Sequence, residues 1–324
     1  MAEAGEARSL IGRFRKWLVG ALAVAIVLYV GGSIWAGFDQ VGQALANFEW
    51  AGFVAAVLLT LVGNYALRLA KWHWLMGRLG VRISLADDAL IFVAGLAMVI
   101  SPFKAGELLK PYLVRERTGV PMATTIPALI TERLTDGIAA LILAAVGVSH
   151  YASHNSGYVY GTIAVSLAAV AVLMNERLSM AILGALGHFS AIRRITAKLE
   201  EMYRATRICL APWPFFVTML ISVVAWFAEC WGYQLLWAGF GREVALETAT
   251  FLYAFATVAG GVSPGGLGVA DTLLVGMVES ILQFPKGEVV ACAILIRTAT
   301  LWLGVGMGGI ALLFAGRMLD RAPS

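Results

Sequence analysis

The chain has 324 residues, of which 60% are hydrophobic and 14% charged, and its mean hydropathy is +0.81. This composition excludes an ordinary soluble protein and predicts an all-α, polytopic helical membrane protein formed by one integral domain over residues 1–324. The net charge of +4 is modest and suggests no nucleic-acid partner. Three scattered cysteines argue against a disulfide framework or a metal site.

The N-terminal segment 1–16 is basic and precedes an apolar run from Trp17 to Phe38. That run is longer than the core of a signal peptide, so we interpret it as a retained first span. A bilayer core of about 30 Å requires about 20 apolar helical residues. By this rule we expect six full spans, at 17–37, 51–70, 121–147, 157–175, 212–238 and 288–315.

Two further apolar segments, 86–117 and 247–284, are each interrupted by one of the two Ser-Pro dipeptides in the chain. The first dipeptide is Ser101-Pro102 and the second is Ser263-Pro264, and each proline has a glycine four residues after it. Irregular backbone occurs at membrane depth only where protein or a water-filled cavity covers it. We therefore expect two re-entrant helical hairpins.

The distribution of basic residues predicts the orientation, because cytoplasmic connections carry an excess of Lys and Arg. With a cytoplasmic N-terminus, 18 of the 24 Lys and Arg residues fall on the inner side, with Arg68 and Lys71 among them. Two fall outside and four fall within the membrane. We expect both termini to be cytoplasmic, in the inner membrane of a bacterium.

This orientation makes the two hairpins enter from opposite faces. Residues 86–147 form a hairpin followed by an outward span, and residues 247–315 form a hairpin followed by an inward span. Such inverted repeats are typical of carriers that bind their substrate near the midplane. Between the two units, residues 177–210 form a basic connector. It is either an amphipathic helix on the inner leaflet or a solvated link.

The first unit carries ionisable residues at membrane depth, where each charge costs a few kcal/mol unless it is paired. They are Lys104, Glu107, Lys110, Glu132, Arg133 and Asp136. Two interpretations are open: a structural ion-pair network, for instance between Arg133 and Glu107, or a path for a substrate or a proton.

The second unit has fewer charges, Asp271, Glu279 and Arg297, but contains a glycine-rich run around its break. Gly265, Gly266 and Gly268 would let backbone N–H groups approach an anion at a helix N-terminus. The alternative is that these glycines serve tight helix packing. No cofactor motif, metal-binding motif or catalytic motif is present, so we expect no enzyme activity.

The motifs Pro102-x-x-x-Gly106-Glu107, Glu132-Arg133-x-x-Asp136 and Ser263-Pro264-Gly265-Gly266-Leu267-Gly268 occur in this order. In this respect the chain resembles the lysylphosphatidylglycerol synthase transmembrane-region (flippase-like) family. The resemblance implies a domain that moves an aminoacylated phospholipid between leaflets. In two-domain members a soluble aminoacyl-transferase domain makes that lipid, and because this chain ends at Ser324 we expect a stand-alone member without it. Stand-alone members are associated with isoprenoid-linked and hopanoid lipids as well as phospholipids.

The expected function is therefore translocation of an anionic or glycosylated lipid. Lys104, Arg133 and Arg297 would hold the phosphate, with Glu107, Lys110 and the three glycines completing the binding site. Glu132, Asp136 and Asp271 would balance charge or couple transport to protons. Two other hypotheses are a non-catalytic subunit of a lipid-modifying or glycosyltransferase complex and a membrane-embedded lipid-phosphate enzyme. Membrane lipids, and in the first of these a lipid-modifying enzyme, would be the partners.

Overall fold

A computed structural model describes residues 2–101, 106–151, 206–261 and 263–319, and every regular element in this part of the chain is a helix. The protein is an all-α, polytopic membrane protein. Four helices are long and apolar enough to cross a bilayer: Leu18–Ala36, Trp50–Arg78, Pro212–Gly239 and Lys286–Ala315. They correspond to four of the six predicted spans. The predicted span 157–175 and most of the connector 177–210 lie outside the described residues.

The chain begins with α1 (Ala2–Ala36) and the short α2 (Phe38–Ala46). Two long continuous helices, one after α2 and one at the end of the described chain, each contain a π-helical stretch between α-helical parts, and we call them the two rods. The first rod joins α3 (Trp50–Leu58), η1 (Leu59–Ala66) and α4 (Leu67–Arg78). The second joins α15 (Lys286–Arg297), η5 (Thr298–Trp302) and α16 (Leu303–Leu319). The π-helical stretches of the two rods meet where the Tyr65 hydroxyl donates a hydrogen bond to the Thr300 carbonyl.

The first broken segment consists of α5 (Leu85–Leu96) with the 3₁₀ turn η2 (Ala97–Ile100), a break, and α6 (Leu109–Thr118). Ser84 caps α5 by accepting a hydrogen bond from the backbone N–H of Asp87. Gly119 ends α6 in the left-handed conformation at φ 74°. The helix α7 (Met122–Tyr151) follows. Its 30 residues extend about 45 Å, which is enough to cover the predicted span 121–147.

The second broken segment has the same order. It consists of α13 (Leu246–Gly260), the 3₁₀ turn η4 (Pro264–Gly266) and α14 (Val269–Ile281). The chain reaches it through α12 (Pro212–Gly239), which packs along the whole of the first rod. Both segments are therefore helix pairs broken at their Ser-Pro dipeptides, as predicted.

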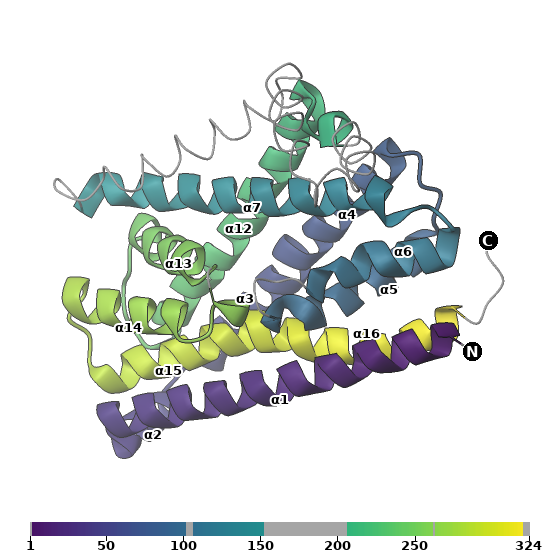
Figure 1. The fold of residues 1–324 in the computed structure, drawn as a ribbon. Coiled ribbons are helices and arrows are strands. Elements are labelled where there is room, and N and C mark those ends of the chain that lie inside the picture. Colours follow the sequence, from purple (N-terminus) through teal and green to yellow (C-terminus); the bar gives the residue numbers. More distant parts are fainter. Residues whose placement is uncertain (1, 102–105, 152–205, 262, 320–324) are drawn as a thin grey trace, which may run out of the picture.

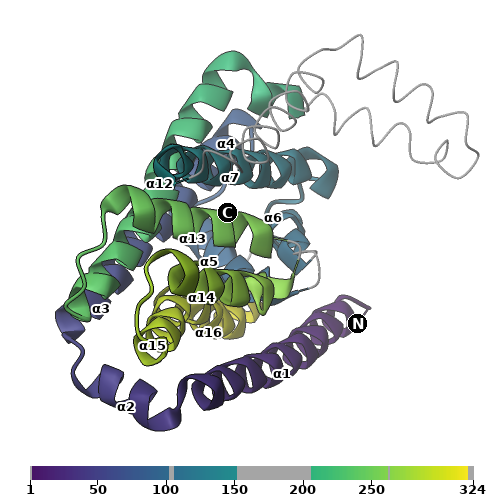
Figure 2. The same ribbon diagram turned by 90° about the vertical axis from the view of Figure 1, so that its left-hand side faces the viewer.

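The two units pack reciprocally. The helix α7 of the first unit lies against α13 of the second, and α16 of the second lies against α5 of the first. In Figure 1, α5 and α6 lie on the side where α1 begins and α16 ends, whereas α14 and α2 lie on the opposite side. Figure 2 shows α3 and α12 on one flank of the bundle and α1 along its edge. The breaks η2 and η4 are in contact, and Gly265 packs against Ile100.

One predicted boundary is wrong. We expected the second span to end at residue 70 and Lys71 to be cytoplasmic, together with Arg68 at the end of the span. The helix instead continues to Arg78, and both basic side chains are buried, with Arg68 6% exposed and Lys71 fully enclosed. The positive-inside rule treats a basic residue at the end of an apolar run as interfacial, although these two have acidic partners inside the protein.

The crossing of α16 and α5 depends on a glycine. A Cβ atom at Gly308 would lie 2.8 Å from the carbonyl oxygen of Val93 and 2.9 Å from the Cα of Ala97. We predict that Gly308→Val lowers the free energy of unfolding in detergent by about 1–3 kcal/mol, because the helices must separate. Gly306→Val is the matched control, since a Cβ there meets nothing within 4 Å. Equal stability of the two variants would contradict this packing.

Candidate functional site

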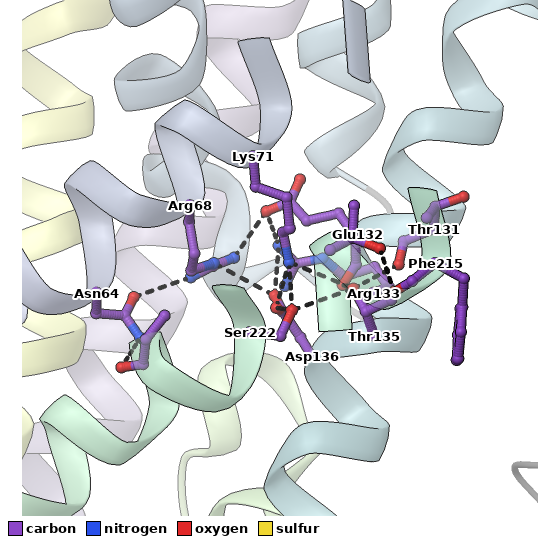
Figure 3. Close-up of polar contacts among 12 residues, drawn as sticks. Asn64, Arg68, Lys71, Thr131, Glu132, Arg133, Thr135, Asp136, Phe215 and Ser222 are labelled. Atoms are coloured by element: carbon purple, nitrogen blue, oxygen red, sulfur yellow. Dashed lines mark hydrogen bonds and ion pairs between the residues drawn. The ribbon is translucent and has the colours of Figure 1, made fainter. Parts of the chain in front are cut away.

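A buried network of ion pairs joins α4, α6 and α7 in the interior. Figure 3 shows the part of it that α4 and α7 form. The first centre of the network is Glu132, whose carboxylate is completely enclosed. Glu132 accepts hydrogen bonds from Arg68 at 3.0 Å, from the neighbouring Arg133 at 2.6 Å and from Lys110. The Lys110 ammonium also lies 4.3 Å from the centre of the Trp72 ring, a cation–π contact that lowers the cost of its burial.

The second centre is Asp136, one helical turn further along α7. Lys71 donates to its carboxylate at 2.6 Å, Arg68 lies 3.3 Å away, and Ser222 of α12 donates at 3.0 Å. Glu132 and Asp136 therefore share the inward face of α7, as their spacing predicts. Because Arg68 contacts both carboxylates, the two centres form one network.

The network has more cations than anions. Its ion pairs join four cations, Arg68, Lys71, Lys110 and Arg133, to three carboxylates, Glu107, Glu132 and Asp136, which leaves a formal charge of +1. Three of the cations are almost completely enclosed, but the Arg133 side chain is 27% exposed. Arg133 is thus the cation of this network that an incoming anion can reach most easily.

In each unit an ion pair joins a carboxylate beside the break to an arginine of the helix that follows the hairpin. We call this pair the latch of the unit. In the first unit Arg133 lies 3.0 Å from Glu107, which follows the break, and in the second Arg297 lies 2.7 Å from Asp271. In both units the acid precedes its arginine by 26 residues. Each break is therefore held to the helix that follows its hairpin by an acid–arginine pair at the same spacing.

All three nitrogens of the Arg297 guanidinium donate hydrogen bonds at the second break. Nε donates to Asp271, while the two terminal nitrogens donate to the carbonyl oxygens of Gly265 at 3.4 Å and Gly266 at 3.1 Å. Gly265, Gly266 and Gly268 all have positive φ, between 62° and 82°, where a residue with a Cβ would be strained. The glycines thus turn carbonyl groups towards Arg297.

A carboxylate of the protein itself, that of Asp271, lies at the N-terminus of α14. Asp271 accepts a hydrogen bond from the backbone N–H of Gly268 at 2.9 Å while it binds Arg297. This carboxylate occupies the position in which we expected a phosphate to bind. A direct contact between the glycine N–H groups and a ligand stays a prediction, and such a ligand would have to replace Asp271.

A cavity of about 100 Å³, which we name the central cavity, lies between the first rod, α12, α13 and the second break. Arg68 of the first rod and Arg297 of the second unit both line it. The remaining polar lining includes Glu229, whose carboxylate accepts a hydrogen bond from the Tyr253 hydroxyl at 2.7 Å. Arg133 is not part of this lining but is connected to it, because Arg133 and Arg68 share an oxygen of Glu132. The cavity lies at the junction of the units, and its lining combines apolar side chains with charged groups of both signs.

Sequence reasoning found most of this site but missed three residues. Arg68 and Lys71 were assigned to the cytoplasmic side, and Glu229 was not considered, although it is the only charged residue between Pro212 and Gly239. A lone carboxylate in an apolar run is a functional signal in itself. Lys104 lies outside the described residues.

No group of three or more His, Cys, Asp or Glu side chains within the described ranges could hold a metal ion. Chemically, the site can bind an anion at its arginines by exchanging one carboxylate for another anion.

We predict that Glu132→Gln lowers the free energy of unfolding by about 3 kcal/mol, because it leaves Lys110, Arg68 and Arg133 without their shared carboxylate. Denaturant titration in detergent micelles would measure the change. The control is Glu116→Gln, which removes an ion pair to the exposed Arg115 and should cost less than about 0.5 kcal/mol. A similarly small effect at Glu132 would show that the network does not stabilise the fold.

Comparison with known proteins places the site in a family. A search of curated proteins finds no match to this chain. The profile of the family described as lysylphosphatidylglycerol synthase TM region matches residues 19–308, a range that contains both broken segments, the buried network and the cavity. The family indicates a membrane function related to lipids. The chain belongs to the lysylphosphatidylglycerol synthase transmembrane-region family.

Proposed function

We propose that this protein translocates an anionic or glycosylated lipid between the leaflets of a bacterial inner membrane. The observation that carries the proposal is the meeting of two broken helix pairs, each latched by an acid–arginine pair, beside the central cavity. Broken helices that meet at a charged midplane are the usual substrate sites of carriers built from inverted repeats. In this proposal both broken pairs are re-entrant hairpins.

The charge balance favours an anionic guest. A charge at the bilayer centre costs a few kcal/mol even on lenient scales, so an excess positive charge inside the network is stabilised by an anion that enters. The phosphate of a lipid headgroup would supply that anion, and arginine binds phosphate with a planar fork of donors. Arg133 is the partly exposed cation of the buried network, and Arg297 lines the cavity from the second unit.

The latches suggest how the site would open. A phosphate that binds Arg297 competes with Asp271, and release of Asp271 frees the N–H of Gly268 at the start of α14. The same exchange at Arg133 would free Glu107 next to the first break. Each exchange would loosen one hairpin, so that the headgroup opens the unit to which it is bound. Glu132, Asp136 and Asp271 would balance charge or carry protons in this cycle.

The orientation completes the proposal. The start of α1 and the end of α16 lie on the same side of the molecule, as an even number of crossings requires (Figure 1). The excess of basic residues predicted on that side makes both termini cytoplasmic.

A second function, that of a non-catalytic subunit in a lipid-modifying or glycosyltransferase complex, is favoured by one observation. Arg133 and Arg297 each have carboxylate partners within the chain and need no ligand for neutralisation. If the pairs serve only the fold, activity of the partner enzyme should survive their replacement in any variant that folds. The proposal of translocation predicts the opposite.

We predict that Arg133→Ala and Arg297→Ala each slow lipid translocation at least about tenfold, the loss that corresponds to one charged hydrogen bond. The assay is leaflet-resolved fluorescence in proteoliposomes, with a panel of labelled anionic and glycosylated lipids. Arg297→Lys keeps the charge but loses the fork and should have intermediate activity.

Arg242→Ala is the control, because Arg242 forms a two-pronged pair with Glu288 at the surface, at 2.7 and 2.9 Å. Gel filtration would establish that each variant is folded. Folded Arg133→Ala and Arg297→Ala proteins that move lipid at the wild-type rate would refute the proposed site.

A further inference from the structure

A second cavity, of about 380 Å³, lies on the side of the bundle between α1, α14 and α15. Its walls are mainly apolar and include Val275 of α14 together with Ala293 and Ile294 of α15. From Tyr29 to Trp35 the α1 wall rises about 9 Å, so the cavity is a short groove along the helices. It is distinct from the central cavity, and we name it the lateral groove.

The lateral groove is continuous with the lipid-facing surface of the protein. Its outer wall, α1, contains the candidate span Leu18–Ala36, of which only 17% is buried inside the protein. Ile26 and Val27 on that helix are 61% and 70% exposed. The helix packs against α15, α2 and η2, whereas residues of α14 line the groove opposite it. Figure 2 shows α1 along the edge of the bundle. Hydrocarbon that covers α1 in the bilayer therefore has direct access to the groove.

Ion pairs lie at both ends of this apolar stretch, Asp271–Arg297 at one and Glu279–Lys286 at the other, and Glu279 itself lines the groove. At one end Asp271 lines the groove while it binds Arg297, which itself lines the central cavity. The Asp271–Arg297 latch thus separates the groove from the central cavity. At the other end the Lys286 ammonium lies 4.2 Å from the centre of the Trp35 ring, and an interfacial tryptophan with a lysine is typical of the membrane surface.

The size of the lateral groove limits the kind of molecule that it can bind. A helix with its side chains is about 10–12 Å wide, which is more than a groove of this volume can hold between helices that share α15 as a neighbour. A single hydrocarbon chain fits, with its polar end beside the Asp271–Arg297 latch and its apolar length against Val275, Ala293 and Ile294. A lipid has the same arrangement, with a polar headgroup at one end of an apolar chain.

We infer that the lateral groove binds a hydrocarbon chain of a membrane lipid whose headgroup lies at the Asp271–Arg297 latch. This inference rests on the proposed function, because it identifies where the chain stays while the headgroup passes through the protein. It assigns the substrate class as a lipid that crosses with its tail outside the central cavity. The latch then lies at the junction between tail and headgroup.

Glycines allow a direct test, because a Cβ at Gly276 or Gly31 would meet nothing within 4 Å. Gly276→Leu places a side chain in the groove from α14, its Cβ meets no atom within 4 Å, and leucine is the better helix former, so we expect the variant to keep the fold. Gly20→Leu is the matched control. Gly20 also lies on an exposed part of α1 with no neighbour within 4 Å, but it is not part of the groove.

The probe is phosphatidylglycerol with a photoreactive group in its acyl chain, reconstituted with the full chain in proteoliposomes. We expect adducts on Val275, Ala293 and Ile294, falling about tenfold in Gly276→Leu because several methylene contacts are lost, and unchanged in Gly20→Leu. Adducts spread equally over Ile26 and Val27, and insensitive to Gly276→Leu, would show ordinary lipid contact and overturn the inference.

Translocation measured on the same vesicles separates the two proposals. Groove adducts that depend on Gly276, in wild-type protein that moves no lipid, would refute translocation and support the groove as a lipid-binding site. Translocation at the wild-type rate in Gly276→Leu, without specific adducts in the wild type, would refute the groove and leave translocation standing.

Discussion

The arrangement of the interior depends on the cost of placing charge in a medium without water. Glu132 and Asp136 on α7 can be buried only because Arg68, Lys71, Lys110 and Arg133 surround them. Removing Glu132 would leave Lys110 without its carboxylate, and removing Asp136 would do the same to Lys71. Removing Arg133 would in turn leave the carboxylate of Glu107 without its ion pair. The requirement is therefore mutual, and it determines where α4, α6 and α7 lie relative to one another. Ser222 extends the same constraint to α12.

This constraint also connects structure to function. An ion network with complete neutralisation would be a purely structural element, whereas this one has one cation in excess and one arginine that is partly exposed. The two latches have the same acid-to-arginine spacing in units that share little sequence identity. Repetition of the interaction without repetition of the surrounding residues suggests that the pair itself is what both units need. Exchange of its carboxylate for a lipid phosphate is the simplest use of such a pair in a membrane.

The sequence was sufficient for the features that depend on local composition. Long apolar runs predicted four spans, three of them close to their observed bounds, and the Ser-Pro dipeptides located both helix breaks. The sequence was insufficient where the environment of a side chain depends on a partner far along the chain. Nothing near Arg68 distinguishes an interfacial arginine from a buried one, because its acids lie 64 and 68 residues further along the chain. Likewise the glycines around Pro264 were compatible with N–H groups directed at a ligand, and only the position of Arg297 shows that carbonyl groups face it.

The π-helical stretches have a consequence for motion. A π turn holds one residue more than an α turn, so its conversion to α-helix moves the surplus residue along the rod and rotates the following segment by about 100°. In this protein one such stretch ends at Ala66, two residues before Arg68, and the other begins at Thr298, immediately after Arg297. Register slippage in either rod would turn an arginine of the central cavity towards or away from its lumen. The rods thus contain, next to the arginines that line the cavity, a means of reorienting them without unfolding a helix.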